Sequence, residues 1–195
     1  MEQLCVALAE RFEARRLPLR ADPKKSPFRI YRDVRFSKDK SPYKTNLGAD
    51  FPYVDASAAG GGDAEGPHSG GGGYVHISPA ESFVGGGMWH PEPARLAAFR
   101  TMVDKDPEQV MKAVEEPGFV ARFGSLSSDG EMLKRVPTGY PPDHPRAELL
   151  KMKNVVFGRS LALEEVFSAK LPDILVDDFA AAMPVYRLLA SLPAA

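Results

Sequence analysis

The sequence predicts a single α+β domain over residues 1–195, in which helices cover a largely antiparallel β-sheet. A chain of 195 residues is long enough for one domain with a substantial core and short for two. Segments with strand character come early and helical segments follow, without the alternating rhythm of a parallel sheet. The strand-like segments 74–77 and 82–89 are joined by four residues. They must pair antiparallel, because a parallel pair needs a crossover of about a dozen residues.

The first helix is predicted over residues 1–16. Leu4, Leu8 and Phe12 recur there at helical spacing and form one apolar stripe. Cys5 lies beside this stripe, and we expect a small core residue there rather than a reactive thiol. Because Cys5 is the only cysteine, an internal disulfide and a multi-cysteine metal site are excluded.

Alternating side chains predict a strand over residues 28–36. Arg32 falls in its apolar row, so either the strand ends near Arg32 or the guanidinium is buried and paired. A second strand is predicted over 46–53, where Pro52 favours the edge of a sheet. The glycine-rich stretch 55–73 cannot pack a core and predicts a mobile loop.

Prolines and capping residues divide the second half of the chain into segments. Asp106 followed by Pro107 supplies an N-cap aspartate and a proline at the first helical position. Pro184 is expected to kink the last helix. In order, the predicted elements are a helix from Pro93, a helix from Pro107 that ends before Pro117, a strand at 132–136, a helix at 147–153, a strand at 155–157 and a helix at 172–192.

Positive charge is concentrated in residues 20–46, which hold nine lysines and arginines against three aspartates. This basic window carries a net charge of +6, whereas the rest of the chain carries −7. A chain that is nearly neutral overall has therefore gathered its positive charge in one segment, and such a field attracts an anionic partner. A pI of about 6.4 disfavours a general nucleic-acid-binding protein.

Several function classes lack their sequence signatures. No apolar run reaches the roughly 20 residues of a membrane helix. The N-terminal residues lack a positively charged start and are soon interrupted by Glu10, so we expect no secretory signal and a cytoplasmic protein without a membrane partner. The four histidines stand in no metal-ligand spacing, and there is neither a P-loop nor a Gly-x-Ser-x-Gly elbow. We expect no metal and no cofactor, and the residues name no reaction.

The segment 29–44 has the pattern Arg-x-x-Arg-Asp-x-Arg-Phe-x-x-x-Lys-x-Pro-Tyr-Lys. This pattern resembles the defining motif of a widespread family of conserved bacterial proteins of unknown function, with members also in fungi. The stretches 82–93 and 133–140 resemble the same family, so the likeness covers the chain from about Arg20 onward. The family resemblance implies no activity.

This chain departs from the family pattern in two places. The resemblance implies an additional N-terminal helical segment with an aromatic pair, and this chain is expected to start after it. The glycine-rich insert at 60–73 is longer than the resemblance implies. Residues missing at the N-terminus would affect the core and any site that they help to build.

Candidate ligand-binding residues gather in the basic window. An arginine fork matches a phosphate or carboxylate with two hydrogen bonds, and a lysine adds a point charge. Arg29 and Arg35 lie roughly 20 Å apart along a straight strand, so they cannot both grip one phosphate. Arg35 with Lys40 or Lys44 is the expected clamp, because the chain turns back between them. The basic candidates are Arg29, Arg32, Arg35, Lys40 and Lys44.

Four further residues are candidates with open alternatives. Asp33 has three interpretations: an orienter of an arginine or cap of the turn, a general base, or a metal ligand. Tyr43 is interpreted as a proton donor or stacking platform, or as a half-buried turn residue. Gly86 lies in a triple glycine that precedes a helix start, which suggests an anion nest, although close backbone packing also requires glycine. Trp89 follows and is expected to line the same pocket.

Two functional hypotheses remain. The first is binding, with or without turnover, of a small anionic or phosphorylated ligand at the basic motif. The second is a non-enzymatic module for nucleic acid or protein, in which the arginine–aspartate motif is structural. Aromatic residues interleaved with the basic ones support the nucleic-acid version, and the near-neutral charge of the whole chain counts against it.

Overall fold

A computed structural model describes residues 1–31, 41–54 and 71–193, and over these ranges the chain forms eight helices and one four-stranded antiparallel sheet. The strands lie in chain order: β1 (Leu47–Pro52), β2 (Gly72–Ile77), β3 (Ser82–Met88) and β4 (Val155–Ser160). The helices are α1 (Glu2–Ala14), α2 (Pro93–Lys105), α3 (Pro107–Val114), α4 (Pro117–Phe123), α5 (Ala147–Lys151), α6 (Leu163–Val166), α7 (Leu171–Ala181) and α8 (Met183–Ala190). The predicted α+β class with a largely antiparallel sheet is confirmed.

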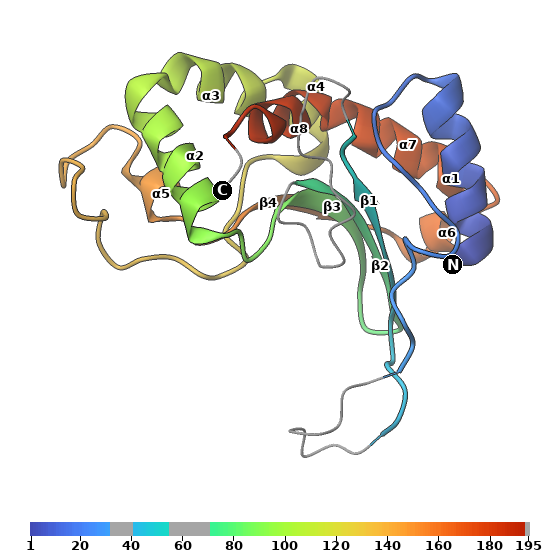
Figure 1. Ribbon diagram of the computed structural model, residues 1–195. Coiled ribbons are helices and arrows are strands. Elements are labelled where there is room, and N and C mark those ends of the chain that lie inside the picture. The colour runs from blue at the N-terminus through green and yellow to red at the C-terminus, as the bar shows by residue number, and fades with distance from the viewer. Residues whose placement is uncertain (32–40, 55–70, 194–195) are drawn as a thin grey trace.

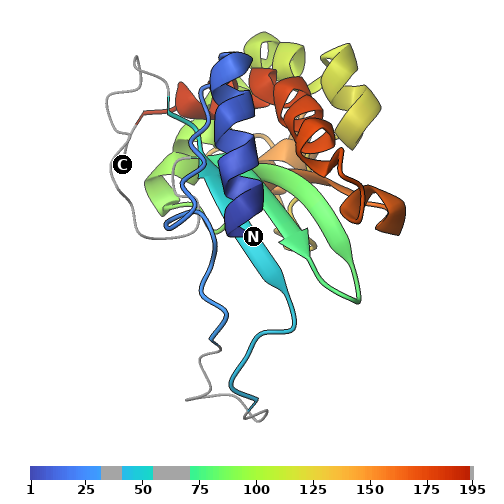
Figure 2. The same cartoon turned by 90° about the vertical axis from the view of Figure 1, so that its right-hand side faces the viewer.

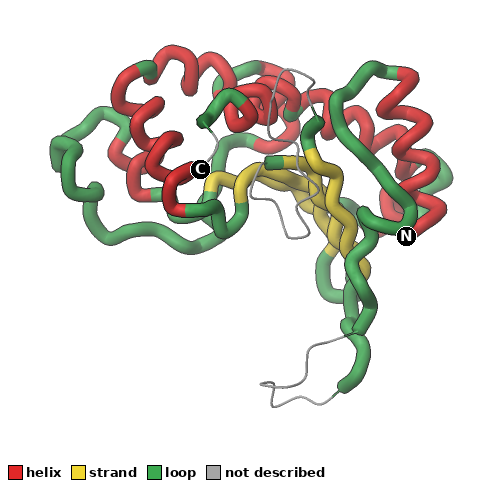
Figure 3. Tube along the Cα trace, viewed as in Figure 1, coloured by secondary structure: helices red, strands yellow, loops and turns green. Residues whose placement is uncertain are grey.

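The helices lie mainly on one side of the sheet. Figures 1 and 3 show α1, α4, α7 and α8 above a curved layer of strands, whereas none of the helices in the described ranges covers the lower face. Side chains alternate accordingly: Phe51, Val75, Val84 and Phe157 point into the helix-covered core and are 0–4% exposed. We call the other side the open face, defined by Asp50, Tyr74, His76 and Phe83.

Helix α1 packs on the sheet through the predicted apolar stripe. The Phe12 ring lies 5.9 Å from the ring of Phe51 on β1 and 5.7 Å from that of Phe179 on α7. Figure 2 shows α1 crossing in front of β1. Cys5 is fully buried beside Leu8, and burial raises the pKa of its thiol to about 11. The expected core role of Cys5 is confirmed.

Capping residues set the bounds of α3 and α4. The Asp106 carboxylate accepts a hydrogen bond from the Gln109 amide at 3.1 Å, which confirms the predicted N-cap. Glu116 caps α4 in the same way, at 2.8 Å from the Phe119 amide. Helix α4 is not predicted by the sequence pattern, because Pro117-Gly118 also marks the end of the preceding helix.

Two predicted strands differ from the structure. Residues 132–136 form no strand, and Met132 contributes only a single bridge to Met152. Of the strand predicted at 28–36, the described part, 28–31, forms no strand: the Phe28 amide donates to Gly48 on β1, and Tyr31 forms an isolated bridge with Tyr43. The predicted kink at Pro184 is confirmed as a break between α7 and α8, with Pro184 in the first turn of α8.

Glycines let α7 and α8 approach the strands closely. A Cβ on Gly73 would lie 2.6 Å from the Phe179 ring, and one on Gly86 would lie 2.5 Å from the Tyr186 hydroxyl oxygen. A side chain at either position would clash with α7 or α8, so both positions need glycine if the helices are to stay this close to the sheet. The Tyr186 hydroxyl is buried without a hydrogen-bond partner in the described structure, and burial raises its pKa well above the ordinary value.

An ion network centred on the buried Asp178 joins four elements. Asp178 on α7 is fully buried and accepts hydrogen bonds from Arg159 on β4 at 2.6–3.0 Å and from Arg122 on α4 at 2.9 Å. Arg159 also donates to Glu165 on α6 at 2.9 and 3.1 Å. The hydrogen bonds to Asp178 and Glu165 raise the pKa of the Arg159 guanidinium. The hydrogen bonds that Glu165 accepts from Arg159 lower the pKa of the Glu165 carboxyl group.

Candidate functional site

The described part of the basic window packs along the edge of β1 that faces away from β2. Ser26 is buried, its carbonyl accepts a hydrogen bond from the Asp50 amide at 3.0 Å, and the Phe28 amide donates to Gly48 at 2.8 Å. Asp22 closes a turn before this contact, since its carboxylate accepts hydrogen bonds from the amides of residues 24 and 25. One of the three aspartates in the window therefore has a structural role.

The two described ends of the motif lie side by side. The Lys44 amide donates to the Ile30 carbonyl at 2.8 Å, and a bridge joins Tyr31 to Tyr43. Figures 1 and 2 show both segments extending below the sheet, away from the helices. The rings of Tyr31 and Tyr43 lie 5.6 Å apart and are 60% and 54% exposed. Tyr43 therefore lies at the surface, and its role in ligand binding stays a prediction.

Lys44 links the motif to the open face. Its ammonium group lies 5.8 Å from the centre of the Phe28 ring, within the range of a cation–π interaction. The Phe28 ring in turn lies 5.8 Å from the ring of Tyr74 on β2. Positive charge from the motif therefore reaches an aromatic surface on the sheet.

The open face brings together polar and aromatic side chains from three strands. Asp50 on β1 is opposite Tyr74 on β2, and His76 is opposite Phe83 on β3. The Tyr74 hydroxyl lies 3.2 Å from His76 Nδ1, and the His76 ring stacks on Phe83 at 5.0 Å with an interplanar angle of 9°. Since Gly48 has no side chain, the Tyr74 hydroxyl fits over it.

Partial burial perturbs the titration of this face. Burial raises the pKa of Asp50 to about 6, although a backbone hydrogen bond and the charge of Arg20 act in the opposite direction. Burial also raises the pKa of Tyr74, and the nearby Asp50 carboxylate adds to that effect. Such groups, held near one another in a partly dry place, are typical of functional sites and are also found in structural networks.

Gly86 and Trp89 lie away from the described part of the motif. Gly86 is on the helix-covered face, between β2 and β4 and beneath Tyr186. Trp89 is 41% exposed and follows the end of β3, at the opposite end of the sheet from Lys44. Its ring contacts His90 at 4.2 Å. The structure does not bring these two candidates to Lys44, and their role in anion binding stays a prediction.

The remaining motif candidates divide into described and undescribed positions. Arg29 is exposed beside the paired segments. The candidates Arg32, Asp33, Arg35 and Lys40 lie outside the described residues, as does most of the glycine-rich stretch, 55–70. Asp50, Tyr74 and Phe83 are not among the site residues predicted from the sequence. Their alternation along strands was visible, but the register that aligns them was not.

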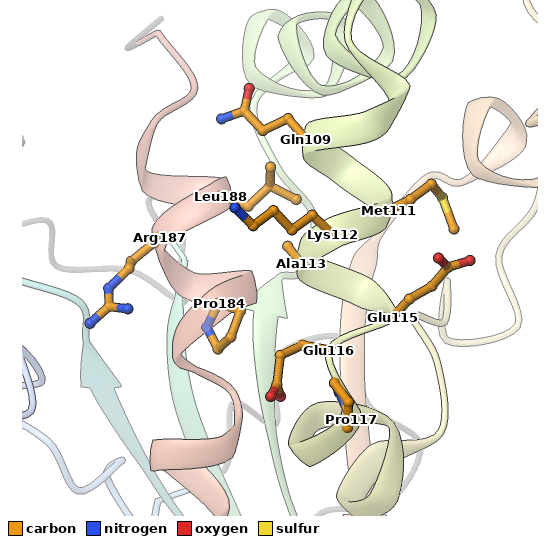
Figure 4. A pocket seen from close by; sticks show the side chains of 10 residues that line it. All are labelled: Gln109, Met111, Lys112, Ala113, Glu115, Glu116, Pro117, Pro184, Arg187 and Leu188. Atoms are coloured by element: carbon orange, nitrogen blue, oxygen red, sulfur yellow. The ribbon is translucent and has the colours of Figure 1, made fainter.

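A shallow groove of about 600 Å³ runs between α3 and α8 on another part of the molecule. Figure 4 shows Lys112 reaching from α3 towards α8, while Arg187 and Met111 point away from the space between the helices. The walls are mostly apolar, and the lining holds two basic residues, Lys112 and Arg187, against two acidic ones, Glu115 and Glu116, so the groove has no dominant sign of charge. It is therefore a weaker candidate for an anion than the basic window.

Further observations bear on metals and membranes. Over residues 1–31, 41–54 and 71–193, no group of three or more histidine, cysteine, aspartate or glutamate side chains is placed to hold a metal ion. Over the same ranges, no helix combines the length and apolar character needed to cross a membrane.

Comparisons with known proteins identify a family and no individual relative. A search of curated proteins and a search of solved structures each found no match. The model of a conserved hypothetical protein family (DUF2461) matches residues 1–187, which is nearly the whole chain and includes the motif segment. The chain therefore belongs to this conserved hypothetical protein family.

Proposed function

We propose that the protein binds a small anionic or phosphorylated ligand at the basic motif, beside the open face of the sheet. The observation that carries this proposal is the placement of Lys44, whose ammonium group reaches the Phe28 ring and, through it, the surface that holds Tyr74. The net charge of +6 in residues 20–46 supplies the attracting field. Arginines and lysines of the motif provide the charge-assisted hydrogen bonds that a phosphate needs.

The proposal is tested by titrating inorganic phosphate and phenyl phosphate into the protein, with calorimetry and thermal unfolding as readouts. A ligand present at about 100 times its Kd stabilises the fold by roughly 2.7 kcal/mol. Lys44→Ala is expected to weaken binding about tenfold or more, because a charge-assisted contact contributes about 1.5–3 kcal/mol. Arg35→Ala tests the motif beyond the described residues.

Lys112→Ala is the matched control, since Lys112 is an exposed lysine in the α3–α8 groove. It is expected to leave phosphate binding unchanged. Equal affinities for the wild type, Lys44→Ala and Arg35→Ala would overturn the proposal, as would the absence of any binding at low salt.

A second candidate, single-stranded nucleic acid, is favoured by one observation. Tyr31 and Tyr43 present two neighbouring exposed rings beside Arg29, and basic residues with exposed aromatics are typical of surfaces that stack nucleobases. This candidate predicts oligonucleotide binding that weakens steeply with salt and is lost in Tyr31→Ala. Phosphate binding that Tyr31→Ala leaves intact, without oligonucleotide binding, would favour the small anion.

A further inference from the structure

The open face carries a connected row of rings that anion binding alone does not require. Phe28, Tyr74 and Phe83 follow one another at 5.8 and 5.7 Å between ring centres, and His76 stacks on Phe83. All four side chains are only partly buried, although the facing residues on the other side of the sheet are fully buried. In Figure 1 the described helices lie mainly on the other side of the sheet.

The rings are held in place by their own contacts. The Tyr74 hydroxyl lies at hydrogen-bond distance from His76 Nδ1, and the missing side chain at Gly48 leaves room for that hydroxyl. Phe28 is fixed because its amide donates to β1. A platform that is ordered before a ligand arrives loses less conformational entropy on binding.

The first ring of the row, Phe28, lies next to the ammonium group of Lys44. Lys44 stands over Phe28, and Tyr74 is the next ring along. If the anionic group of a ligand binds Lys44, the part of the ligand next to that group lies over the rings of Phe28 and Tyr74. Aromatic faces favour flat unsaturated rings over saturated ones, since stacking needs a planar π surface.

We propose that the anion recognised by this protein carries a flat unsaturated ring, which stacks on the open face against Tyr74 and its neighbours Phe28 and Phe83. This inference rests on the proposed function and adds the class of ligand to it. Tyr74 and His76 offer hydrogen bonds to polar atoms at the edge of the ring. A peptide strand or a second copy of the chain on the same face is the competing occupant.

The test compares three phosphates that share the same charge: phenyl, cyclohexyl and methyl phosphate. Calorimetry on the full chain is expected to show phenyl phosphate binding about fivefold or more tightly than the other two, because stacking on one aromatic side chain typically contributes on the order of 1 kcal/mol. Cyclohexyl phosphate separates stacking from simple hydrophobic burial, since it has similar bulk without a flat ring.

Tyr74→Leu and Phe83→Leu are expected to abolish the preference for phenyl phosphate while methyl phosphate still binds. Phe167→Leu is the matched control, because Phe167 is 80% exposed and lies just beyond α6, away from the open face. Thermal unfolding of each variant shows whether it folds. If Tyr74→Leu fails to fold, Phe83→Leu carries the test alone.

The possible outcomes separate the two proposals. Equal binding of the three phosphates, lost in Lys44→Ala, would overturn the ring inference and leave the anion site standing. Absence of binding for all three phosphates would overturn the anion site and, with it, the ring inference that rests on that site. A dimer that dissociates in Phe83→Leu would assign the face to a second copy and overturn the ring inference.

Discussion

Asp50 carries a carboxyl group whose ionisation the fold opposes. Its pKa is raised from 3.8 to about 6, mainly by burial, whereas Asp22 in the exposed turn has a lowered pKa because backbone amides stabilise its charge. Asp22 inside the basic window and Asp50 just outside it therefore have pKa values shifted in opposite directions. Local solvation and hydrogen bonding decide this difference, not the residue type.

The raised pKa of Asp50 predicts a pH-dependent stability. Between pH 4 and pH 6 the folded state binds more protons at this group than the unfolded state, so stability from Asp50 falls as pH rises through that window. Asp50→Asn removes this titrating group, so the variant lacks the loss of stability that Asp50 causes in the wild type as the pH rises. We expect the difference between the melting temperatures, variant minus wild type, to increase by about 2–4 °C from pH 4 to pH 7. This increase corresponds to about 1 kcal/mol in the free energy of unfolding after allowance for solvent screening.

Asp129→Asn is the control for this measurement, because Asp129 is exposed in the turn before Glu131. It reports the effect of the substitution itself at a surface position. A difference between Asp50→Asn and the wild type that stays constant from pH 4 to pH 7 would contradict the assigned pKa.

At the scale of elements, the spacing between the helix layer and the sheet depends on glycines. Gly73→Ala would place a Cβ against the Phe179 ring and push α7 away from β2. The expected cost is about 1–3 kcal/mol, as for overpacking in other cores. Chemical denaturation by urea measures it as a lower transition midpoint.

Gly158→Ala is the matched control on β4. A Cβ there would meet no atom closer than the Val84 carbonyl oxygen at 3.3 Å, so a small adjustment accommodates it. The loss of stability is expected to be clearly smaller than for Gly73→Ala. Equal losses would show that flexibility of the strands, rather than contact with α7, sets the cost.

Elements with local signals could be predicted from the sequence, and elements without them could not. The start of α3 follows from Asp106 and Pro107 alone, because a cap and its helix are neighbours in the chain. Pro117-Gly118 looks like a helix end by composition, yet Glu116 caps a new helix there. Such a short helix is held by burial of Phe119 against Phe157, a contact between distant residues.

At the scale of the whole molecule, the ion network around the buried Asp178 joins β4, α4, α6 and α7. Asp178→Asn is expected to destabilise the fold by about 3 kcal/mol or more, since it leaves the partly buried Arg159 without its main partner. Asp177→Asn next to it is the control. Asp177 pairs with Arg15 at the exposed surface, where an ion pair contributes about 1 kcal/mol or less.

Global unfolding followed by circular dichroism distinguishes these two variants. The Asp178 variant should lower the transition temperature in one cooperative step, because the network spans four elements. Similar losses for Asp177→Asn and Asp178→Asn would mean that the network around Asp178 contributes no more than a surface pair.

The candidate site illustrates what sequence analysis could and could not provide. The basic window was visible because charge is counted along the chain. The open face was not, since Asp50 and Tyr74 become neighbours only through the β1–β2 register, and 23 residues separate them in sequence. Strand alternation fixes which residues share a face of one strand. It does not say which residue of the next strand stands opposite.

The burial of Cys5 has a practical consequence for labelling. Cys5, the only cysteine of the chain, is 0% exposed, so reagents in solution do not reach its thiol. Because the pKa of this thiol is about 11, it is also almost entirely protonated at neutral pH. A single cysteine introduced at Gly158, on the exposed part of β4, would then be the one thiol that a maleimide dye modifies in the folded protein. The native chain thus serves directly as the background for fluorescence reporters on the sheet.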